Sequence, residues 1–211
     1  MTEEHENTVE LMGYYGGDTT HALSAWTSTS RELTDEKRAR IGKLLADLAK
    51  DKHGTPFEKS AIHFLVKCDI VTHYQLLKHR IGVSINSESA RYKELKDDRC
   101  FYVPTDWDDE EQARYEIFME SALKKYHETL ARLKQKGYST KRAKETARYY
   151  LPLGKQLKLD ILYNFRSFMH MVGLRKPDSA QLEIRRLTDK KLELVRGTGA
   201  FRESLRAFGY E

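Results

Sequence analysis

Hydrophobic residues recur along the chain with two spacings, one typical of strands and one typical of helices. Alternation with period two predicts a half-buried strand over residues 61–71. The side chains that alternate there are Ile62, Phe64, Val66, Cys68 and Ile70. Residues 8–12 alternate more briefly and predict an edge strand, and residues 100–103 predict a strand that ends at Pro104. These strands predict a small sheet built from the first half of the chain.

Spacings of three and four residues predict helices over most of the remaining sequence. Thr34 precedes two acidic residues and begins a helix that Gly54 can stop. A short helix over residues 72–80 would place three side chains on one face, those of Gln75, Lys78 and His79. Other helices are expected over residues 106–136, 139–149, 155–172 and 178–195, with a short one near the C-terminus.

Helical patterns dominate, and no strand–helix–strand repeat is evident in the sequence. The fold class is therefore α+β. The chain has 211 residues, enough for a substantial core, and shows no evident internal boundary. We therefore expect one domain over residues 1–211.

Composition describes a polar chain with 39% hydrophobic and 33% charged residues, and no apolar run approaches the length that crosses a bilayer. The N-terminus lacks the apolar core of a secretory signal, and the two cysteines form no Cys-x-x-Cys pair or zinc pattern. We expect a cytoplasmic protein with no membrane span and no metal. The net charge of +5 favours anionic partners, and the even spread of the cations favours specific anion sites.

The stretch from residue 78 to residue 92 carries the densest candidate chemistry. It runs Lys-His-Arg-Ile-Gly-Val-Ser-Ile-Asn-Ser-Glu-Ser-Ala-Arg-Tyr, so cations alternate with short hydrogen-bonding side chains. That mixture suits a nucleotide, because its phosphate attracts cations and its neutral parts need hydroxyl and amide partners. The cations are Lys78, Arg80 and Arg91, and the hydrogen-bonding residues are Ser84, Asn86, Ser87 and Ser89.

Three further segments carry polar groups that either act in a site or have a local structural purpose. In residues 53–58, His-Gly-Thr-Pro-Phe-Glu, a proline turn delivers a hydroxyl and a carboxylate, or simply caps the next element. In residues 148–152, Arg-Tyr-Tyr-Leu-Pro, the cation alone is typical of a helix C-terminus. In residues 164–170, Arg166 and His170 lie four apart on one helix face, a placement that is common on surfaces.

Together the four segments resemble the motifs of flavin-dependent thymidylate synthases. The family signature Arg-His-Arg-x-x-Ser-x-Asn-x-x-Ser-x-Arg-Tyr keeps its spacing from Ser84 to Tyr92, with Lys78 replacing the first arginine and one extra residue before Ser84. The segments also match His-x-Thr-Pro-Phe-Glu, Ala-Arg-x-x-Leu-Pro, Asn-x-Arg-Ser and Ala-Gln-x-Glu-Ile-Arg. The resemblance implies the family fold, a helix-rich domain with a small, mainly antiparallel sheet.

The resemblance also implies which residues contact the two ligands. Those implied for FAD are Thr55, Glu58, Lys78, His79, Arg80, Ile81, Asn86, Asn164, Arg166 and His170. Those implied for dUMP are Gln75, Lys78, Ser87, Glu88, Ser89, Ala90, Arg91, Arg148 and Arg175. Arg175 is also implied to be catalytic, because a guanidinium at a ring carbonyl would stabilise negative charge on the pyrimidine.

By the same resemblance, the expected reaction converts dUMP to dTMP. Methylenetetrahydrofolate would donate the carbon, and FAD reduced by NADPH would supply the hydride. Family members bind FAD between the subunits of a homotetramer, so the resemblance implies that assembly here. Cys68 falls in the inward register of its strand and is expected in the core, not as a nucleophile.

Two alternative functions stay open at this point. A flavoenzyme of the same fold would make another C5-modified pyrimidine nucleotide, for example by hydroxymethylation; the departures from the family pattern at Lys78, His170 and Ser179 leave room for this. Trp26 also occupies the place of a family arginine. A non-enzymatic basic protein would instead show salt-dependent nucleic-acid binding, although no nucleic-acid module is evident.

Overall fold

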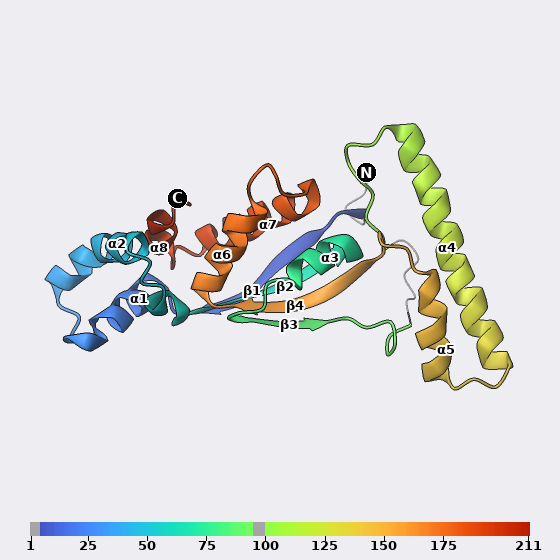
Figure 1. The fold of residues 1–211 in the computed structure, drawn as a ribbon, viewed down its shortest axis with the longest axis horizontal. Coiled ribbons are helices and arrows are strands. Elements are labelled where there is room, and N and C mark those ends of the chain that lie inside the picture. The colour runs from blue at the N-terminus through green and yellow to red at the C-terminus, as the bar shows by residue number, and fades with distance from the viewer. Residues whose placement is uncertain (1–4, 95–99) are drawn as a thin grey trace. The chain divides into compact units, whose positions relative to one another are not determined.

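The computed structural model of the protein describes residues 5–94 and 100–211 (Figure 1). Four strands form one sheet in the order β1-β2-β4-β3. Their bounds are β1 Thr8–Tyr15, β2 Ala61–Asp69, β3 Val83–Ser87 and β4 Gln156–Tyr163. The sheet is antiparallel and the rest of the described chain is mainly helical, which confirms the predicted fold class.

The helices are α1 Asp18–Ala25, α2 Asp35–Lys50, α3 Ile70–Leu76, α4 Asp109–Gln135, α5 Thr140–Ala147, α6 Phe165–Arg175, α7 Leu182–Gly197 and α8 Arg202–Ala207. Short 3₁₀ helices are η2 Trp26–Ser28, η3 Thr55–Glu58 and η4 Arg148–Tyr150. Thr34 caps α2 as predicted, because its side chain accepts the N–H of Lys37. No helix of the described chain is long and apolar enough to cross a membrane.

The largest correction concerns residues 155–172, which were predicted as one helix. Residues 156–163 instead form β4, a central strand, and α6 begins only at Phe165. Leu159, Ile161 and Tyr163 are buried at period two, so the strand pattern is present in the sequence. Asn164 separates the two elements by capping α6, since its side chain accepts the N–H of Ser167.

The strand predicted over residues 61–71 is confirmed as β2, with Cys68 fully buried in it. The short helix that follows starts earlier and ends earlier than predicted, at Ile70 and Leu76. Asp69 causes the early start, because its carboxylate accepts the backbone N–H of Thr72 at 2.8 Å. The prediction that one helix face carries Gln75, Lys78 and His79 is therefore wrong, since the last two follow the helix.

Other element boundaries also differ from prediction, and α7 begins at Leu182 instead of residue 178. The longest helix is capped by Asp108, not Asp106, because the Asp108 carboxylate accepts the N–H of Glu111 at 2.8 Å. The strand predicted over residues 100–103 is only a single bridge, between Phe101 and Lys155. The predicted edge strand is confirmed as β1, while α1 and β3 were not predicted.

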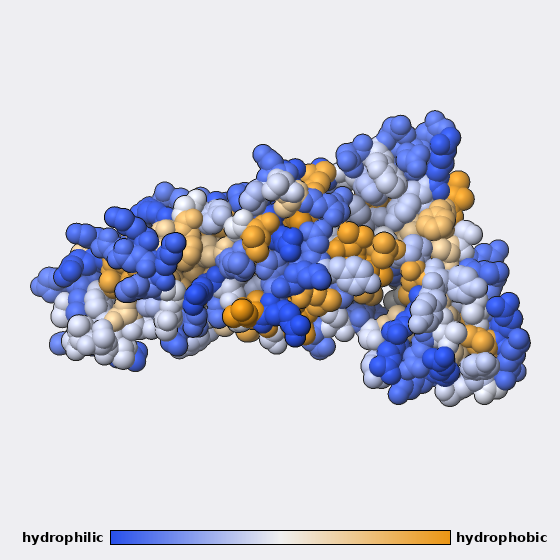
Figure 2. All heavy atoms as spheres, viewed as in Figure 1, coloured by the Kyte–Doolittle hydropathy of each residue, from blue (hydrophilic) through white to orange (hydrophobic). Residues whose placement is uncertain are grey.

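Contacts divide the chain into two compact units. The first unit comprises residues 1–8, 67–76 and 86–159, and the second comprises residues 9–66, 77–85 and 160–211. The expectation of one domain over residues 1–211 stays a prediction. Charged residues make up 33% of the chain, and most of the face seen in Figure 2 is hydrophilic with small hydrophobic patches.

Each unit has its own buried core. In the second unit, Phe64 of β2 and Tyr163 of β4 both pack on Phe168 of α6, with ring centroids 5.8 Å apart in each pair. Each such buried ring contributes roughly 2 kcal/mol, so this contact fixes α6 on the sheet. In the first unit, α4 packs on α5 through the buried side chains of Tyr126, Leu130, Ala143 and Ala147.

Candidate active site

The segment after α3 is tied to the start of α6 within the second unit. The N–H of Asn164 donates to the Gly82 carbonyl at 3.0 Å, and the Ser167 hydroxyl donates to the Ile81 carbonyl at 2.7 Å. Gly82 has a φ of +65°, and a Cβ there would lie 2.2 Å from Nδ2 of Asn164. Only glycine therefore fits this turn.

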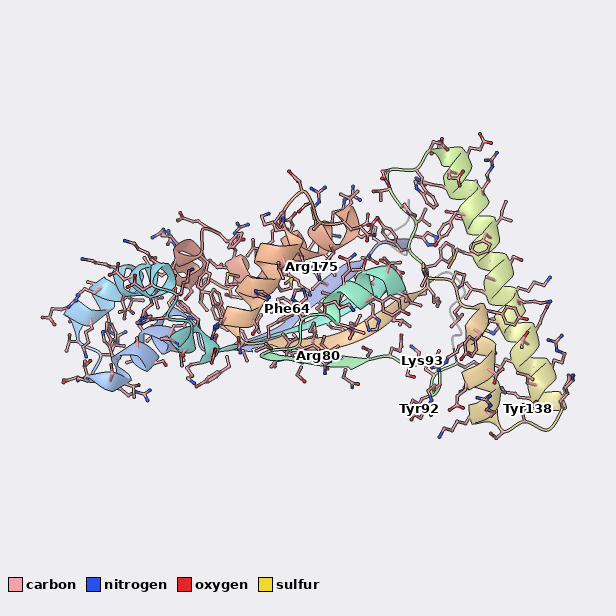
Figure 3. The ribbon with its side chains drawn as sticks, viewed as in Figure 1. Phe64, Arg80, Tyr92, Lys93, Tyr138 and Arg175 are labelled. Atoms are coloured by element: carbon pink, nitrogen blue, oxygen red, sulfur yellow. The ribbon has the colours of Figure 1, made fainter. Side chains whose placement is uncertain are left out.

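The end of α6 reaches the same segment through Arg175, which is labelled in Figure 3. Its Nε donates to Nε2 of His79 at 3.0 Å. His170 lies one helical turn and a half before Arg175, and its ring centroid is 6.1 Å from that of His79. Three of the residues predicted from the motifs, His79, His170 and Arg175, are thus brought together by the fold.

His79 is neutral at physiological pH. Burial is the largest cause, and together with the neighbouring Arg175, His170 and Lys191 it lowers the pKa of His79 to about 4. Because a guanidinium nitrogen always donates, Nε2 of His79 is the acceptor and its proton lies on Nδ1. This histidine therefore presents a fixed tautomer, with only 6% of the residue exposed.

Arg166 and Glu58 form an ion pair, with Nη1 2.6 Å from Oε1. Gly54 makes this possible, because a Cβ there would lie 2.6 Å from Nε of Arg166. A cavity of about 630 Å³ beside them is lined by Thr55 and Trp26 as well as Arg166. The fold therefore gathers three residues predicted for FAD, together with the tryptophan that departs from the family pattern.

Most of the other residues predicted for FAD are exposed, in the second unit except for Asn86, which belongs to the first. Lys78 and Arg80 are exposed, and the Ile81 side chain is 90% exposed although its carbonyl is bound. Asn86 lies in β3, with its side chain on the exposed side of the strand. Asn164 acts locally as the cap of α6. The contacts of these residues with a flavin stay predictions.

Lys191 of α7 is a residue that the sequence analysis missed. It is fully buried, its Nζ donates to the Tyr163 hydroxyl at 3.2 Å, and it lies 5.6 Å from the centroid of the Phe64 ring. Its charge contributes to the low pKa of His79. The available signal was its position four residues after Leu187, on the apolar stripe of the helix.

Most of the residues predicted for dUMP belong to the first unit, while Lys78 and Arg175 belong to the second. The Ser87 hydroxyl lies 3.0 Å from Nε2 of His73, a neighbour that the sequence analysis did not identify. Burial lowers the pKa of His73, while the Asp69 carboxylate raises it. Gln75 belongs to α3 and is partly buried.

The next residues of the segment are held by local bonds. Glu88 pairs with Lys93, and its second oxygen accepts the N–H of Lys158 at 3.3 Å. The Ser89 hydroxyl accepts the N–H of Arg91 at 3.3 Å. Ala90 packs against the buried residues shared by α4 and α5. Ala90 therefore contributes to the packing of α4 and α5, whether or not it also contacts a ligand.

Arg91 and Arg148, two of the three arginines predicted for dUMP, differ in their surroundings. Arg91 is bound by Glu145, with Nε and Nη2 at 3.0 and 2.8 Å from the same oxygen. Arg148 begins η4 and is exposed. The first arginine is therefore already neutralised by a carboxylate, and the second is open to solvent.

A family model described as thymidylate synthase complementing protein matches residues 10–198. A flavin-dependent thymidylate synthase of Streptomyces avermitilis is 31% identical over 189 residues, covering 80% of this chain and 74% of the relative. The chain belongs to the flavin-dependent thymidylate synthase family. This confirms the family predicted from the motifs and, with it, an enzyme of a methyltransferase class.

Other relatives carry the same name. The flavin-dependent thymidylate synthase of Pseudothermotoga lettingae is 32% identical, covering 83% of this chain and 79% of its own. That of Tropheryma whipplei is 31% identical, covering 91% and 88%. The shared name supports a flavin cofactor for the family to which this chain belongs.

Solved structures agree with this assignment. A UMP/dUMP methylase PolB from Streptomyces cacaoi, bound with 5-Br UMP, has a TM-score of 0.78 and 25% identity, covering 97% of this chain and 94% of that one. The same enzyme bound with 5-Br dUMP has a TM-score of 0.77 and 26% identity, covering 97% and 95%. The family fold predicted from the motifs is therefore confirmed.

Proposed function

We propose that this protein is a flavin-dependent thymidylate synthase that converts dUMP to dTMP. The observation that carries the proposal is the family match over residues 10–198, which contains every candidate site residue from Thr55 to Arg175. Methylenetetrahydrofolate is the proposed carbon donor, and NADPH is the proposed reductant of a bound FAD. When bound, the reduced flavin supplies the hydride that completes the methyl group.

The second unit fits the flavin by the chemistry of its residues. The cavity of about 630 Å³ beside η3 offers the hydroxyl of Thr55, the cation of Arg166 and the ring of Trp26. A dinucleotide needs a cation for its phosphates and an apolar surface for its rings, and both kinds of group are present. We assign Arg166 and Thr55 to FAD, with Glu58 holding the guanidinium in place.

Arg175 is the residue that we assign to the reacting pyrimidine. Nε2 of His79 accepts a hydrogen bond from Nε of Arg175, which fixes the plane of the guanidinium. A fixed cation at a ring carbonyl stabilises the negative charge that develops when C5 of the ring acts as a nucleophile. Because His79 is neutral and buried, it holds Arg175 without cancelling its charge.

The nucleotide phosphate needs cations, and we assign Arg91 and Arg148 of the first unit to it. The hydroxyl groups of Ser87 and Ser89 and the side chain of Gln75 are proposed partners for the neutral parts. Lys78 contributes a point charge instead of the paired hydrogen bonds of an arginine. We also propose that the protein assembles as a homotetramer with active sites between its subunits. Its proposed location is the cytoplasm.

A second candidate activity is methylation of UMP. It is favoured by one observation, the similarity to a UMP/dUMP methylase whose structures hold 5-Br UMP and 5-Br dUMP. Family membership favours both of these enzymatic functions over a basic protein that only binds nucleic acid.

The test combines a spectrum with the mass of a product. The purified chain is gel-filtered with FAD, and then incubated with NADPH, methylenetetrahydrofolate and either dUMP or UMP. We expect a flavin spectrum that stays with the protein and shifts with dUMP, and a product that is heavier by one CH₂ group. A gain of CH₂O would identify hydroxymethylation, and a product from UMP alone would identify the second candidate. Retention of no flavin and formation of no product would contradict the proposal.

A further inference from the structure

The second unit contains a cavity of about 590 Å³ whose wall is rich in hydroxyl groups. This volume lies in the range of small-molecule sites. Among the residues assigned to FAD or dUMP, only Glu58 is part of the wall. The hydroxyl groups come from β1, α1, η2 and the segment before β2, and they are those of Tyr15, Thr20, Ser24, Thr27 and Ser60.

Ser60 is a buried residue of this wall, only 5% exposed, and its hydroxyl ends a chain of hydrogen bonds. The Ser204 hydroxyl donates to Oδ1 of Asp18 at 2.6 Å, so its oxygen accepts from Nδ1 of His21 at 2.8 Å. Burial lowers the pKa of His21 to about 4, so the imidazole is neutral and carries one hydrogen. Nε2 of His21 therefore accepts from the Ser60 hydroxyl, also at 2.8 Å.

The direction of these bonds determines what the wall can offer a ligand. The hydrogen of the Ser60 hydroxyl is engaged by His21, so its oxygen can only accept from a ligand. Thr27 is held in the same way, since its hydroxyl donates to the Leu23 carbonyl at 3.0 Å. A ligand at these two oxygens has to supply hydrogen-bond donors, as the hydroxyl groups of a sugar do. Because the protein already orients both groups, binding costs less entropy.

Two cations, Arg31 and Lys59, line the same cavity. In the part of the chain that the structure describes, no ion pair engages either of them. The carboxylate of the wall, from Glu58, lies 2.6 Å from Nη1 of Arg166 and is already paired. Arginine forms paired hydrogen bonds with phosphate and carboxylate groups, and lysine adds a point charge. Both cations are therefore available to an anion.

We propose that this cavity binds a small anion that carries several hydroxyl groups, as sugar phosphates and sugar acids do. The two cations bind its charged end, and the oxygens of Ser60 and Thr27 accept from its hydroxyl groups. Ser24 also lines the cavity assigned to the flavin, so the two sites are neighbours. The proposal does not depend on the reaction proposed above.

Calorimetric titration of the full chain, with FAD and dUMP present in excess, tests the site. The probes are ribose 5-phosphate and gluconate, which separate the two kinds of anion, and the comparison compounds are ribose and inorganic phosphate. We expect saturable binding of at least one probe at one site per chain, and binding of both comparison compounds at least about tenfold weaker.

Two substitutions examine the two kinds of contact. Arg31→Gln should weaken binding of the probe by at least about tenfold, because it removes a charged hydrogen-bond donor. Ser60→Ala should weaken it by about fivefold, because it removes one acceptor. The matched control is Arg40→Gln, which removes an exposed charge from α2 outside the wall and should leave the affinity within about twofold.

Lys59 gives a second readout in the unaltered chain, so the test stands even if a variant does not fold. Bound probe should slow acetylation of Lys59 several-fold and leave that of Lys43, an exposed lysine of α2, unchanged. Equal weakening by Arg31→Gln and Arg40→Gln would overturn the proposal, as would equal affinity for inorganic phosphate and the probe. Binding that disappears when FAD and dUMP are present would place the probe in one of their sites, and this result or the absence of saturable binding would also overturn it.

Discussion

Arg175 at the end of α6 donates its Nε hydrogen to Nε2 of His79 across 3.0 Å, joining two residues that lie 96 positions apart. The bond requires a neutral histidine, since a protonated imidazole has no acceptor. Burial of His79 and the charge of Arg175 both lower the pKa of the histidine, so the pair is self-consistent. The position of the Arg175 guanidinium and the conformation of the segment after α3 therefore depend on each other.

Replacement of Arg175 should abolish the proposed reaction without disturbing the assembly. Arg175→Ala is expected to lower the rate of dTMP formation by at least about a hundredfold, because it removes the charge that stabilises the reacting ring. Arg175→Lys is the matched control, and it should retain part of the activity because it keeps the charge but loses the bond geometry. Single-turnover rates and gel filtration measure the two effects. Near-normal turnover in the alanine variant would remove Arg175 from the active site.

The pKa of His79 should also depend on Arg175. In Arg175→Gln the pKa of His79 should rise from about 4, because one neighbouring cation is removed. It should stay below the ordinary value, because burial is the largest cause of the shift and remains in the variant. Proton NMR of the imidazole over a pH series measures this. An unchanged pKa would show that the guanidinium does not act on the ring.

The sequence predicted which residues belong to the site better than it predicted which of them are bonded to each other. The motifs brought Arg166 and Glu58, and also His79 and Arg175, into one expected site, because each motif is contiguous and has a fixed spacing. The bonds that join these pairs connect distant segments, and no periodicity reports such contacts. The roles of these residues toward FAD and dUMP stay predictions.

Parts of the fold were likewise predicted from the sequence, and other parts were not. The strand β2 was predicted because apolar side chains alternate along its whole length, even though α3 follows it directly. The strand β4 was misassigned because it passes into α6 with only Asn164 between them and no glycine or proline. With no break in sequence, the apolar residues of both elements look like one helical stripe. The missing information was the pairing of residues 156–163 with two other strands, which only tertiary structure supplies.

Acid should destabilise the protein through His21. This histidine is fully buried between the hydroxyls of Ser60 and Ser204, each 2.8 Å from a ring nitrogen, and burial lowers its pKa to about 4. In the unfolded chain the group titrates near pH 6.5, so the unfolded state binds the proton first as the pH falls. The resulting stability is present above about pH 6.5 and is lost as the pH falls towards about 4, by up to about 3 kcal/mol.

Urea unfolding at a series of pH values measures this loss. The control is His21→Gln, which keeps polar contacts to the two serines but cannot titrate, so its stability should depend less steeply on pH over the same range. His79 has a lowered pKa as well and contributes with the same sign, so some dependence should persist in the variant. Identical slopes in the variant and the unaltered chain would rule out His21 as a source of the effect.

Gly82→Ala should damage both stability and flavin binding. The substitution places a side chain at a φ of +65° and within 2.2 Å of Asn164. We expect a loss of at least about 2 kcal/mol, because strain in the backbone adds to a steric clash. Gly137→Ala is the control: its φ is +85°, but no atom lies within 4 Å of the added Cβ. That variant should lose only about 1 kcal/mol from backbone strain.

Thermal unfolding and retention of FAD on gel filtration measure the two consequences. Because Ile81 and Gly82 are bonded to the start of α6, the clash should also weaken FAD binding in Gly82→Ala. The Gly137 variant should retain FAD fully, since Gly137 lies after α4 in the first unit. Equal losses of stability in the two variants would show that the clash with Asn164 does not contribute to the destabilisation.

Glu145 should limit how strongly Arg91 attracts a nucleotide phosphate. One oxygen of its carboxylate lies within 3.0 Å of Nε and Nη2 of Arg91, and the other lies 3.5 Å from Nη1 of Arg142. The bond from Arg91 holds the pKa of the Glu145 carboxyl below its usual range, so this group stays charged at neutral pH. Glu145→Gln removes that charge while keeping the size of the side chain. The affinity for dUMP should therefore rise by about threefold at low salt, and by less at physiological salt.

The matched control is Glu128→Gln, which removes the same charge from α4, where Glu128 pairs with Lys125 at 3.8 Å. If the effect comes from Arg91, the control should leave the affinity for dUMP unchanged at both salt concentrations. Calorimetric titration with dUMP distinguishes the cases. Weaker binding in Glu145→Gln would contradict the prediction, because it would mean that the carboxylate holds Arg91 in its binding orientation and that position matters more than charge.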